Sequence, residues 1–474
     1  MIGGGRLATA LLGLVSIRIA TNLLTPEQYG VLSLLVAVQL FCGMFLINPV
    51  EQHIYRHAHA WWDSRTLWAR LSSYKSYSWI VSGIGAVFVI GTSHPQSLEE
   101  SLLIGLTMFF MVVAVTWNGI TVPMLNMLGF RAESIFWSVL TTGLSVLSSI
   151  LLVTWNNTAI AWFAGQAVGM ALGALGAGLS LWHKGVAANH ATEKLDLIDK
   201  KTVTTYCIPL AIATGLMWLQ LSGYRFAVEH FWGLAALGYI AVGFVLSSQI
   251  WGMFESLATQ LLYPAFYRHI TGSNTKQNEI VLSDLLNILG PMSFVLAGIT
   301  VLSAPALLYA LVDQQYHSAG IFIFFGVVIE CCRVLSNLLS RAAHITRRTR
   351  SLALPYAIGG GAQLIFLCIA GWQQVNVIWV GFGLVAGAVI MLMIMAVNMY
   401  REVHYELDMR RWLLAGGVLA FFAMVGIWLP APTSIWQALC VLCVVGVSGA
   451  GLMYLLAWKN PATGRLLGVE LRGV

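Results

Sequence analysis

The basic residues of this chain alternate between the gaps that separate its long apolar runs. Of the 25 Lys and Arg residues, 22 fall in every second gap, and none falls in the gaps between those. Loops on the cytoplasmic side of a membrane keep Lys and Arg, whereas translocated loops are depleted of them. The pattern therefore predicts a chain that crosses a membrane many times and keeps its basic gaps in the cytoplasm.

The composition also indicates a membrane-embedded chain. The 474 residues are 58% hydrophobic and 9% charged, whereas soluble domains carry about 25% charged residues. The formal net charge of +6 is spread over many short segments rather than gathered in one patch, which argues against binding of nucleic acid. His and Cys residues show no convincing metal-ligand pattern, so no metal is expected.

The apolar runs are long enough to be transmembrane helices, which need about 20 apolar residues each. Fourteen candidate spans cover residues 5–25, 29–48, 77–93, 101–123, 134–155, 158–182, 204–226, 234–256, 285–305, 319–340, 352–371, 377–399, 413–429 and 435–458. An even number places both termini on one side, which the basic gaps identify as the cytoplasm. The fold class predicted is an all-α, polytopic membrane protein with about 14 transmembrane helices.

Three arginines depart from this pattern because they lie inside apolar runs: Arg18, Arg225 and Arg333. A charged side chain at the centre of a membrane helix costs roughly 2.5–3.5 kcal/mol on the insertion scale. Such a residue therefore usually faces a cavity or a partner and marks a functional site. Two other interpretations stay open. For Arg18 and Arg225, the alternative is that the side chain extends along the helix to the outer membrane surface. For Arg333, the alternative is that its charge is neutralised by Glu330, three residues earlier on the same helical face.

Glu330 is the carboxylate that lies well inside a predicted span. Burial of a carboxylate favours its protonated form, which suits a group that takes up and releases an ion. A local pair with Arg333 is the alternative. Glu255 is predicted to lie near the membrane interface, and Glu51 is predicted to border a loop, so no acid is expected at depth in the first six spans.

Two similar stretches begin the two halves of the chain, on either side of a charged segment at 183–203. Arg18 precedes Gly30 by 12 residues and Arg225 precedes Gly238 by 13, and each Gly lies beside a Tyr. An acidic turn on the predicted outer side lies between the two residues in each stretch. Both halves begin from the cytoplasm, so the repeat is predicted to be parallel, with its axis along the membrane normal.

The opening residues also carry a family resemblance. Its most specific piece runs Leu23-Leu24-Thr25-Pro26-Glu27-Gln28-Tyr29-Gly30, and further matches are Gly13, Ser16, Arg18, Pro209, Arg225, Tyr263-Pro264 and the segment from Leu311 to Tyr316. In these residues the chain resembles the multidrug/oligosaccharidyl-lipid/polysaccharide (MOP) exporter superfamily and, within it, the Wzx-type polysaccharide or O-antigen flippases. One departure is Gly223-Tyr224, which stands where relatives often carry an acidic residue before the arginine.

The resemblance implies two pseudo-symmetric six-helix lobes around a central cavity, with two extra C-terminal helices. We therefore expect a first lobe over 1–182, a cytoplasmic linker over 183–203, a second lobe over 204–399, and two more spans with a cytoplasmic tail over 400–474. The implied substrate is an undecaprenyl-diphosphate-linked oligosaccharide, moved from the inner to the outer leaflet of the bacterial inner membrane by alternating access. Its products would be O-antigen of lipopolysaccharide, capsule or exopolysaccharide, with a polysaccharide polymerase and chain-length proteins as partners besides membrane lipids.

A diphosphate that crosses hydrocarbon needs cations, and Arg pairs with phosphate through two parallel N–H groups. Arg18, Arg225 and Arg333 are therefore predicted to bind the substrate as a ladder. Polar residues inside spans, among them Asn118 and Gln220, are predicted to line a hydrated path for the sugar. Glu330 is the predicted coupling residue for a proton or sodium ion, and no other cofactor is expected.

Two alternatives remain open. A cation-coupled multidrug exporter of the same superfamily would hold an acidic residue at depth in the first six spans. A membrane polysaccharide polymerase or ligase would need a long outer loop with carboxylates or histidines, and the longest outer gap, 306–318, offers Asp313 and His317. Cytoplasmic segments contain no Walker A or dinucleotide-binding glycine motif. The chain is therefore predicted to be a transporter and not an enzyme.

Overall fold

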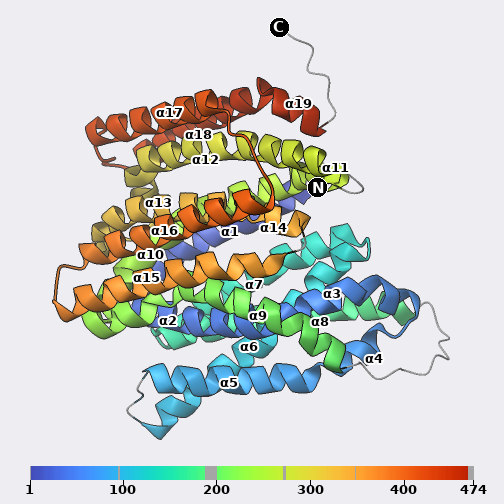
Figure 1. Ribbon diagram of the computed structural model, residues 1–474. Helices are drawn as coiled ribbons and strands as arrows, with labels where there is room; N and C mark the ends of the chain where they lie inside the picture. Colours follow the sequence, from blue (N-terminus) through green and yellow to red (C-terminus); the bar gives the residue numbers. More distant parts are fainter. Residues whose placement is uncertain are drawn as a thin grey trace. The chain divides into compact units, whose positions relative to one another are not determined.

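The computed structural model describes residues 2–93, 95, 97–186, 200–270, 274–346 and 348–467, and this part of the chain contains helices and no strand (Figure 1). The predicted all-α class is confirmed. The chain divides into two compact units, Met1–Gly238 and Tyr239–Val474. Most of the predicted linker, 183–203, lies outside the described residues.

The first unit contains nine α-helices and the beginning of a tenth within the described residues. They are α1 (Ile2–Leu23), α2 (Pro26–Phe41), the π-helix η1 (Cys42–Ile47), α3 (Asn48–Asp63), α4 (Leu67–Ser72), α5 (Lys75–Ser93), α6 (Leu98–Met127), α7 (Arg131–Trp155), α8 (Ala159–Val186), α9 (Lys200–Ser222) and the start of α10 (Tyr224–Leu261). Helix α10 is interrupted at Gly233, whose φ of 83° is a conformation that favours glycine.

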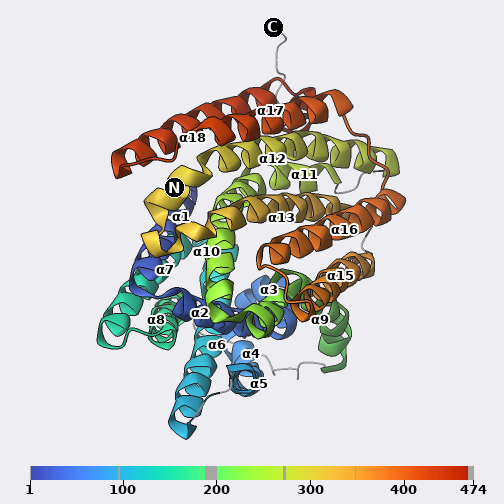
Figure 2. The same cartoon turned by 90° about the vertical axis from the view of Figure 1, so that its left-hand side faces the viewer.

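The second unit contains the rest of α10 and the helices that follow it. They are α11 (Tyr263–Ile270), α12 (Thr275–Leu311), η2 (Gln314–Ala319), α13 (Gly320–Leu339), α14 (Arg341–Ile345), η3 (Thr349–Leu352), α15 (Ala353–Trp372), α16 (Ile378–Glu402), α17 (Met409–Trp428), α18 (Ile435–Trp458) and α19 (Pro461–Leu467). The last two long helices, α17 and α18, both pack along α12, and they lie beside it in both views (Figures 1 and 2).

All fourteen predicted spans fall on helices. Twelve continuous helical segments of the described chain are long and apolar enough to cross a membrane, and a shorter apolar helix covers Leu7–Leu23. One of the twelve, Val203–Leu261, contains two predicted spans. Exposed large apolar side chains on these helices, such as Leu151, Ile365 and Val447, are what a lipid-facing surface requires.

The second predicted span differs from the structure at its inner end. The sequence predicts that this helix stops near residue 48, but α2, η1 and α3 form one helical segment from Pro26 to Asp63. Thr25 caps its start by accepting a hydrogen bond from the backbone N–H of Gln28 at 3.3 Å, and Pro26 suits the first turn. Pro49 falls directly after the π-helical turns, where the helix continues in spite of its missing N–H. Glu51 consequently belongs to a helix rather than to a loop border.

Candidate functional site

Arg333 lies at the centre of a cluster of charged side chains in the second unit. Its Nε donates to Oε2 of Glu330 at 2.7 Å, and its Nη2 donates to Oε2 of Glu255, also at 2.7 Å. Asn337 Nδ2 donates to the other oxygen of Glu255 at 2.9 Å. The side chains of Arg333 and Glu330 are 17% and 14% exposed. Glu330 and Arg333, three residues apart on α13, form the ion pair that their spacing allows. Glu255 on α10 forms a second ion pair with the same guanidinium.

Close packing of α10 against α13 brings Glu255 to Arg333. About two turns before Glu255 on α10, Ser247 Oγ donates to the carbonyl oxygen of Ile323 on α13 at 3.1 Å. A Cβ placed on Gly326 would lie 2.7 Å from that hydroxyl and 3.1 Å from the Cβ of Ser247, so the glycine leaves room for the close approach of the two helices. On α10, Glu255 lies two turns beyond Ser247. On α13, Glu330 and Arg333 lie one to two turns beyond Gly326. The three charged side chains are therefore at a similar height along the two helices and contact one another.

The cluster has more negative than positive groups. Two carboxylates and one guanidinium give a formal charge of −1 when all three are ionised. Glu255 uses both oxygens as acceptors, whereas Glu330 uses one. An uncompensated charge at membrane depth is costly, and Glu330 is the carboxylate of the cluster with one oxygen that accepts no hydrogen bond within the described residues. Arg333 Nη1 makes no hydrogen bond within the described residues.

Arg225 has a different environment in the first unit. Its Nη1 donates to the backbone carbonyl of Ser33 on α2 at 3.0 Å, and its Cζ lies 5.8 Å from the ring centroid of Tyr224. Within the described residues no carboxylate pairs with it. Its Nε is buried without a hydrogen-bond partner. The Gly223-Tyr224 departure noted in the sequence therefore leaves Arg225 with its full positive charge.

The other predicted site residues lie apart from the Arg333 cluster. Arg18 is partly buried on α1 in the first unit, and Gln220 is 6% exposed on α9. Asn118 is engaged in helix packing, because its Nδ2 donates to Oγ1 of Thr141 on α7 and to the carbonyl of Met170 on α8, at 3.3 and 3.4 Å. Arg18 and Arg225 belong to the first unit and Arg333 to the second, so the three-arginine ladder stays a prediction.

The surroundings of two carboxylates, Glu255 and Glu51, differ from those expected from the sequence. Glu255 was expected at the interface, and its contact with Arg333 depends on helix packing that no local sequence signal reports. Glu51 lies against α6, where a Cβ on Gly119 would be 2.8 Å from Oε1. The hydroxyl of Tyr55, one turn further on α3, donates to the carbonyl of the same Gly119. No cation pairs with Glu51 within the described residues.

The described residues contain no group of three or more His, Cys, Asp or Glu side chains placed to hold a metal ion. The two carboxylates of the Arg333 cluster are both bound to the guanidinium. The cluster therefore combines carboxylate oxygens, which attract cations, with guanidinium N–H groups, which can donate to an oxyanion.

The sequence has no match among protein-family models or curated proteins, whereas solved structures share its fold. MurJ, a lipid II flippase in an inward closed conformation, matches with a TM-score of 0.66 at 11% identity, over 96% of this chain and 98% of MurJ. An inward-facing multidrug resistance MATE family transporter of the MOP superfamily matches with a TM-score of 0.54 at 12% identity, over 89% of this chain and 95% of the transporter.

A eukaryotic MATE transporter, AtDTX14, matches with a TM-score of 0.52 at 12% identity, over 90% of this chain and 97% of that one. The protein is therefore a multi-pass membrane protein with the fold of MOP-superfamily transporters. These structures include a lipid flippase, a multidrug resistance transporter and a further MATE transporter, so the particular substrate has to be argued from the charged side chains.

Proposed function

We propose that this protein is a Wzx-type flippase that moves an undecaprenyl-diphosphate-linked oligosaccharide from the inner to the outer leaflet of the bacterial cytoplasmic membrane. The product serves synthesis of O-antigen, capsule or exopolysaccharide. Both termini lie in the cytoplasm in this proposal, and a polymerase and chain-length proteins act on the exported unit. The protein moves its substrate without making or breaking covalent bonds.

The observation that carries this proposal is the unneutralised Arg225. A guanidinium held at membrane depth by a backbone carbonyl keeps its charge and several N–H donors. A phosphate-bearing headgroup supplies the oxyanion that such a group lacks, and burial strengthens the interaction because the local dielectric constant is low. A cationic drug would be repelled by the same group. Arg18 is proposed to act with Arg225, and Asn118 and Gln220 to border the path of the sugar.

The Arg333 cluster is proposed to couple transport to an ion. With Glu330 protonated the cluster has no net charge, and Arg333 is released from one of its two carboxylates. Its donors can then pair with the substrate diphosphate. Loss of the proton restores the Glu330 pair and the net negative charge, which expels the anion. Proton binding and diphosphate binding at Arg333 therefore favour each other.

The test is complementation of a strain that lacks the gene, scored for lipid-linked repeat units retained in the inner leaflet and for polysaccharide at the surface. Arg225→Ala and Arg333→Ala are expected to insert normally and to abolish export, while Arg225→Lys retains part of it. Arg268→Ala on α11 is the matched control, because it removes an exposed arginine. Full export by Arg225→Ala would contradict the proposal.

Glu51 supports a second candidate, a cation-coupled exporter of the same superfamily. From the sequence this class was the less favoured alternative, because no acid was expected at depth in the first six spans. The structure places Glu51 in the helical segment Pro26–Asp63, beside α6 and without a cation among the described residues. Efflux of cationic dyes by cells that express the protein, abolished in Glu51→Gln, would favour this candidate over the flippase.

A further inference from the structure

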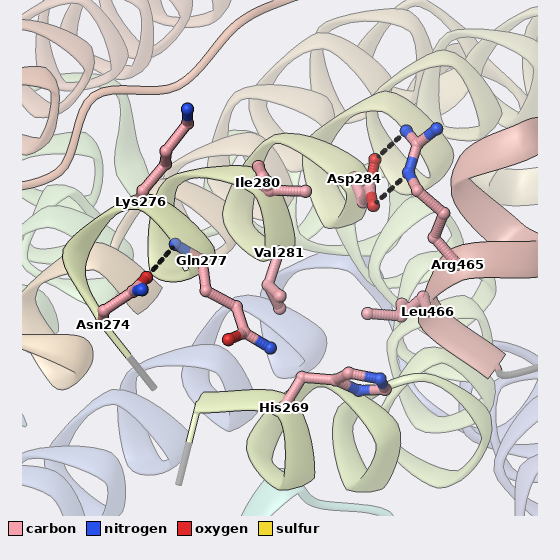
Figure 3. A pocket seen from close by; sticks show the side chains of 9 residues that line it. All are labelled: His269, Asn274, Lys276, Gln277, Ile280, Val281, Asp284, Arg465 and Leu466. Atoms are coloured by element: carbon pink, nitrogen blue, oxygen red, sulfur yellow. Dashed lines mark hydrogen bonds and ion pairs between the residues drawn. The ribbon is translucent and has the colours of Figure 1, made fainter. Parts of the chain in front are cut away.

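A pocket of about 420 Å³ lies among three helices of the second unit (Figure 3). It is formed by the end of α11, the first three turns of α12 and α19, and its volume lies in the range of small-ligand sites. The lining residues are His269, Asn274, Lys276, Gln277, Ile280, Val281, Asp284, Arg465 and Leu466. None of them belongs to the Arg333 cluster or to the proposed transport path.

Asp284 holds Arg465 at one end of this pocket. The carboxylate is 5% exposed, and both of its oxygens accept from the guanidinium, from Nε at 3.0 Å and from Nη2. These hydrogen bonds raise the pKa of Arg465, so the residue stays charged. The side chain of Arg465 is nevertheless 58% exposed, and its Nη1 makes no hydrogen bond within the described residues. The buried acid thus orients a cation whose remaining donors are open to a ligand.

The other two helices add further polar groups. The Nδ1–H of His269 donates to the carbonyl of Ala265 at 2.8 Å, so in the neutral ring Nε2 faces a ligand as a hydrogen-bond acceptor. Figure 3 shows Gln277 extending toward α11, where the His269 ring borders the same space, while the Lys276 side chain extends from α12 away from these two residues. Donors outnumber free acceptors in this lining, because the only carboxylate is already paired with Arg465.

The apolar part of the pocket continues toward the predicted membrane interior. Ile280 follows Lys276 by one turn on the same face of α12 and is 47% exposed, while Val281 and Leu466 close the floor. Lys276 and Asp284 are eight residues apart, which is about 12 Å along a helix. The predicted span begins directly after Asp284. A molecule that fills this pocket would therefore lie beside the cationic side chains of Lys276 and Arg465 at the predicted headgroup level. Its apolar part would contact the exposed side chain of Ile280, nearer the predicted hydrocarbon region.

We propose that this pocket binds the phosphate headgroup of an anionic membrane phospholipid on the predicted cytoplasmic side of the membrane. Arg465 contacts the phosphate, Lys276 and His269 border the rest of the headgroup, and Ile280 contacts the first part of an acyl chain. Basic pockets between membrane helices on this side suit such headgroups. The bound lipid would link α11, α12 and α19. This proposal does not depend on which substrate the protein transports.

The experiment uses the full-length protein, purified in detergent and titrated with short-chain phosphatidylglycerol or phosphatidylcholine, with lipid adducts counted by native mass spectrometry. We expect selective binding of phosphatidylglycerol. Lys276→Gln should weaken that binding about fivefold, the factor expected for one basic residue beside an anionic headgroup, and His269→Gln should weaken it as well. Arg465 is left intact because its loss would strand the buried carboxylate of Asp284.

Arg268→Gln is the matched control, because Arg268 is an exposed cation on the same short helix outside the pocket lining. Its phosphatidylglycerol binding should equal that of the unmodified protein. An equal loss in Lys276→Gln and Arg268→Gln would show attraction to the general charge and would overturn the site. Equal binding of phosphatidylcholine, or displacement of the lipid by an equal concentration of inorganic phosphate, would also overturn the proposal.

Discussion

Gly30 and Gly238 meet in the first unit, each against the helical turn that carries the other. A Cβ on Gly30 would overlap the carbonyl oxygen of Leu234, and a Cβ on Gly238 would overlap the carbonyl oxygen of Pro26. Each carbonyl lies four residues before the glycine of its own stretch, so the two contacts are equivalent under the internal repeat. Matching glycines in the two stretches therefore serve one direct contact between the beginning of α2 and the part of α10 that follows its interruption at Gly233.

Gly30→Ala and Gly238→Ala are expected to lower the free energy of unfolding by about 1–3 kcal/mol each, the usual cost of overpacking. The obstacle is a backbone carbonyl, which cannot rotate away as a side chain can. Thermal unfolding of the purified protein measures the effect. Gly252→Ala on α10 is the control, since nothing lies within 4 Å of its added methyl group. A Gly30→Ala protein as stable as Gly252→Ala would refute the close contact.

Glu255→Gln is expected to destabilise the protein by about 1.5–3 kcal/mol, the range for a hydrogen bond to a charged group. The substitution removes the charged acceptor from Arg333 while keeping the size of the side chain. A double-mutant cycle with Arg333→Gln should give effects that do not add, because the two residues share one bond. Additive effects would mean that the pair does not form in the protein.

Transport is expected to decrease as the pH rises through the titration of Glu330. Protonation removes one negative charge from a cluster whose formal charge is −1, so the protonated form binds a diphosphate better. Glu330→Gln imitates the protonated state and should make transport by proteoliposomes independent of pH. Glu99→Gln, an exposed acid at the start of α6, should keep the pH dependence. A Glu330→Gln protein that retains this dependence would exclude Glu330 as the coupling group.

Asn118→Ala is expected to lower stability by about 1–2 kcal/mol through loss of its bonds to α7 and α8. Thr141→Val removes the acceptor of one of these bonds and should have a similar, smaller effect on thermal unfolding. If Asn118 also borders the sugar path, transport by Asn118→Ala should fall further than transport by Thr141→Val at a temperature where both variants are folded. Equal transport would assign Asn118 to helix packing alone.

Glu51→Gln is expected to fold normally and to reduce ion uptake during transport if Glu51 carries a coupling ion. The carboxamide keeps the packing against Gly119 and removes the charge. Proton uptake and sodium-dependent transport by proteoliposomes separate the two candidate ions, and Glu99→Gln provides the reference. Uptake that is unchanged for both ions would leave Glu51 as a neutral packing residue.

Local signals were sufficient for the helices and for one part of the site. A membrane helix satisfies its backbone hydrogen bonds internally, so apolar length alone was enough to predict segments that all fall on helices. The pair between Glu330 and Arg333 followed from a spacing of three residues on one helix. The inner end of the second predicted span was wrong, because the helical segment continues through the π-helical turns of η1 and past Pro49 to Asp63. The residue types of this segment carry no signal for π-helical turns.

The sequence by itself determined that the chain is helical and crosses a membrane many times, since hydropathy and the distribution of charge act over single segments. It also isolated the charged residues that are costly to bury. Only the tertiary structure decided which of these charges are neutralised. Glu255 and Arg333 are 78 residues apart, and Ser33 and Arg225 are 192 apart. Their meeting depends on helix faces that glycine contacts bring together, and no local pattern encodes which face meets which.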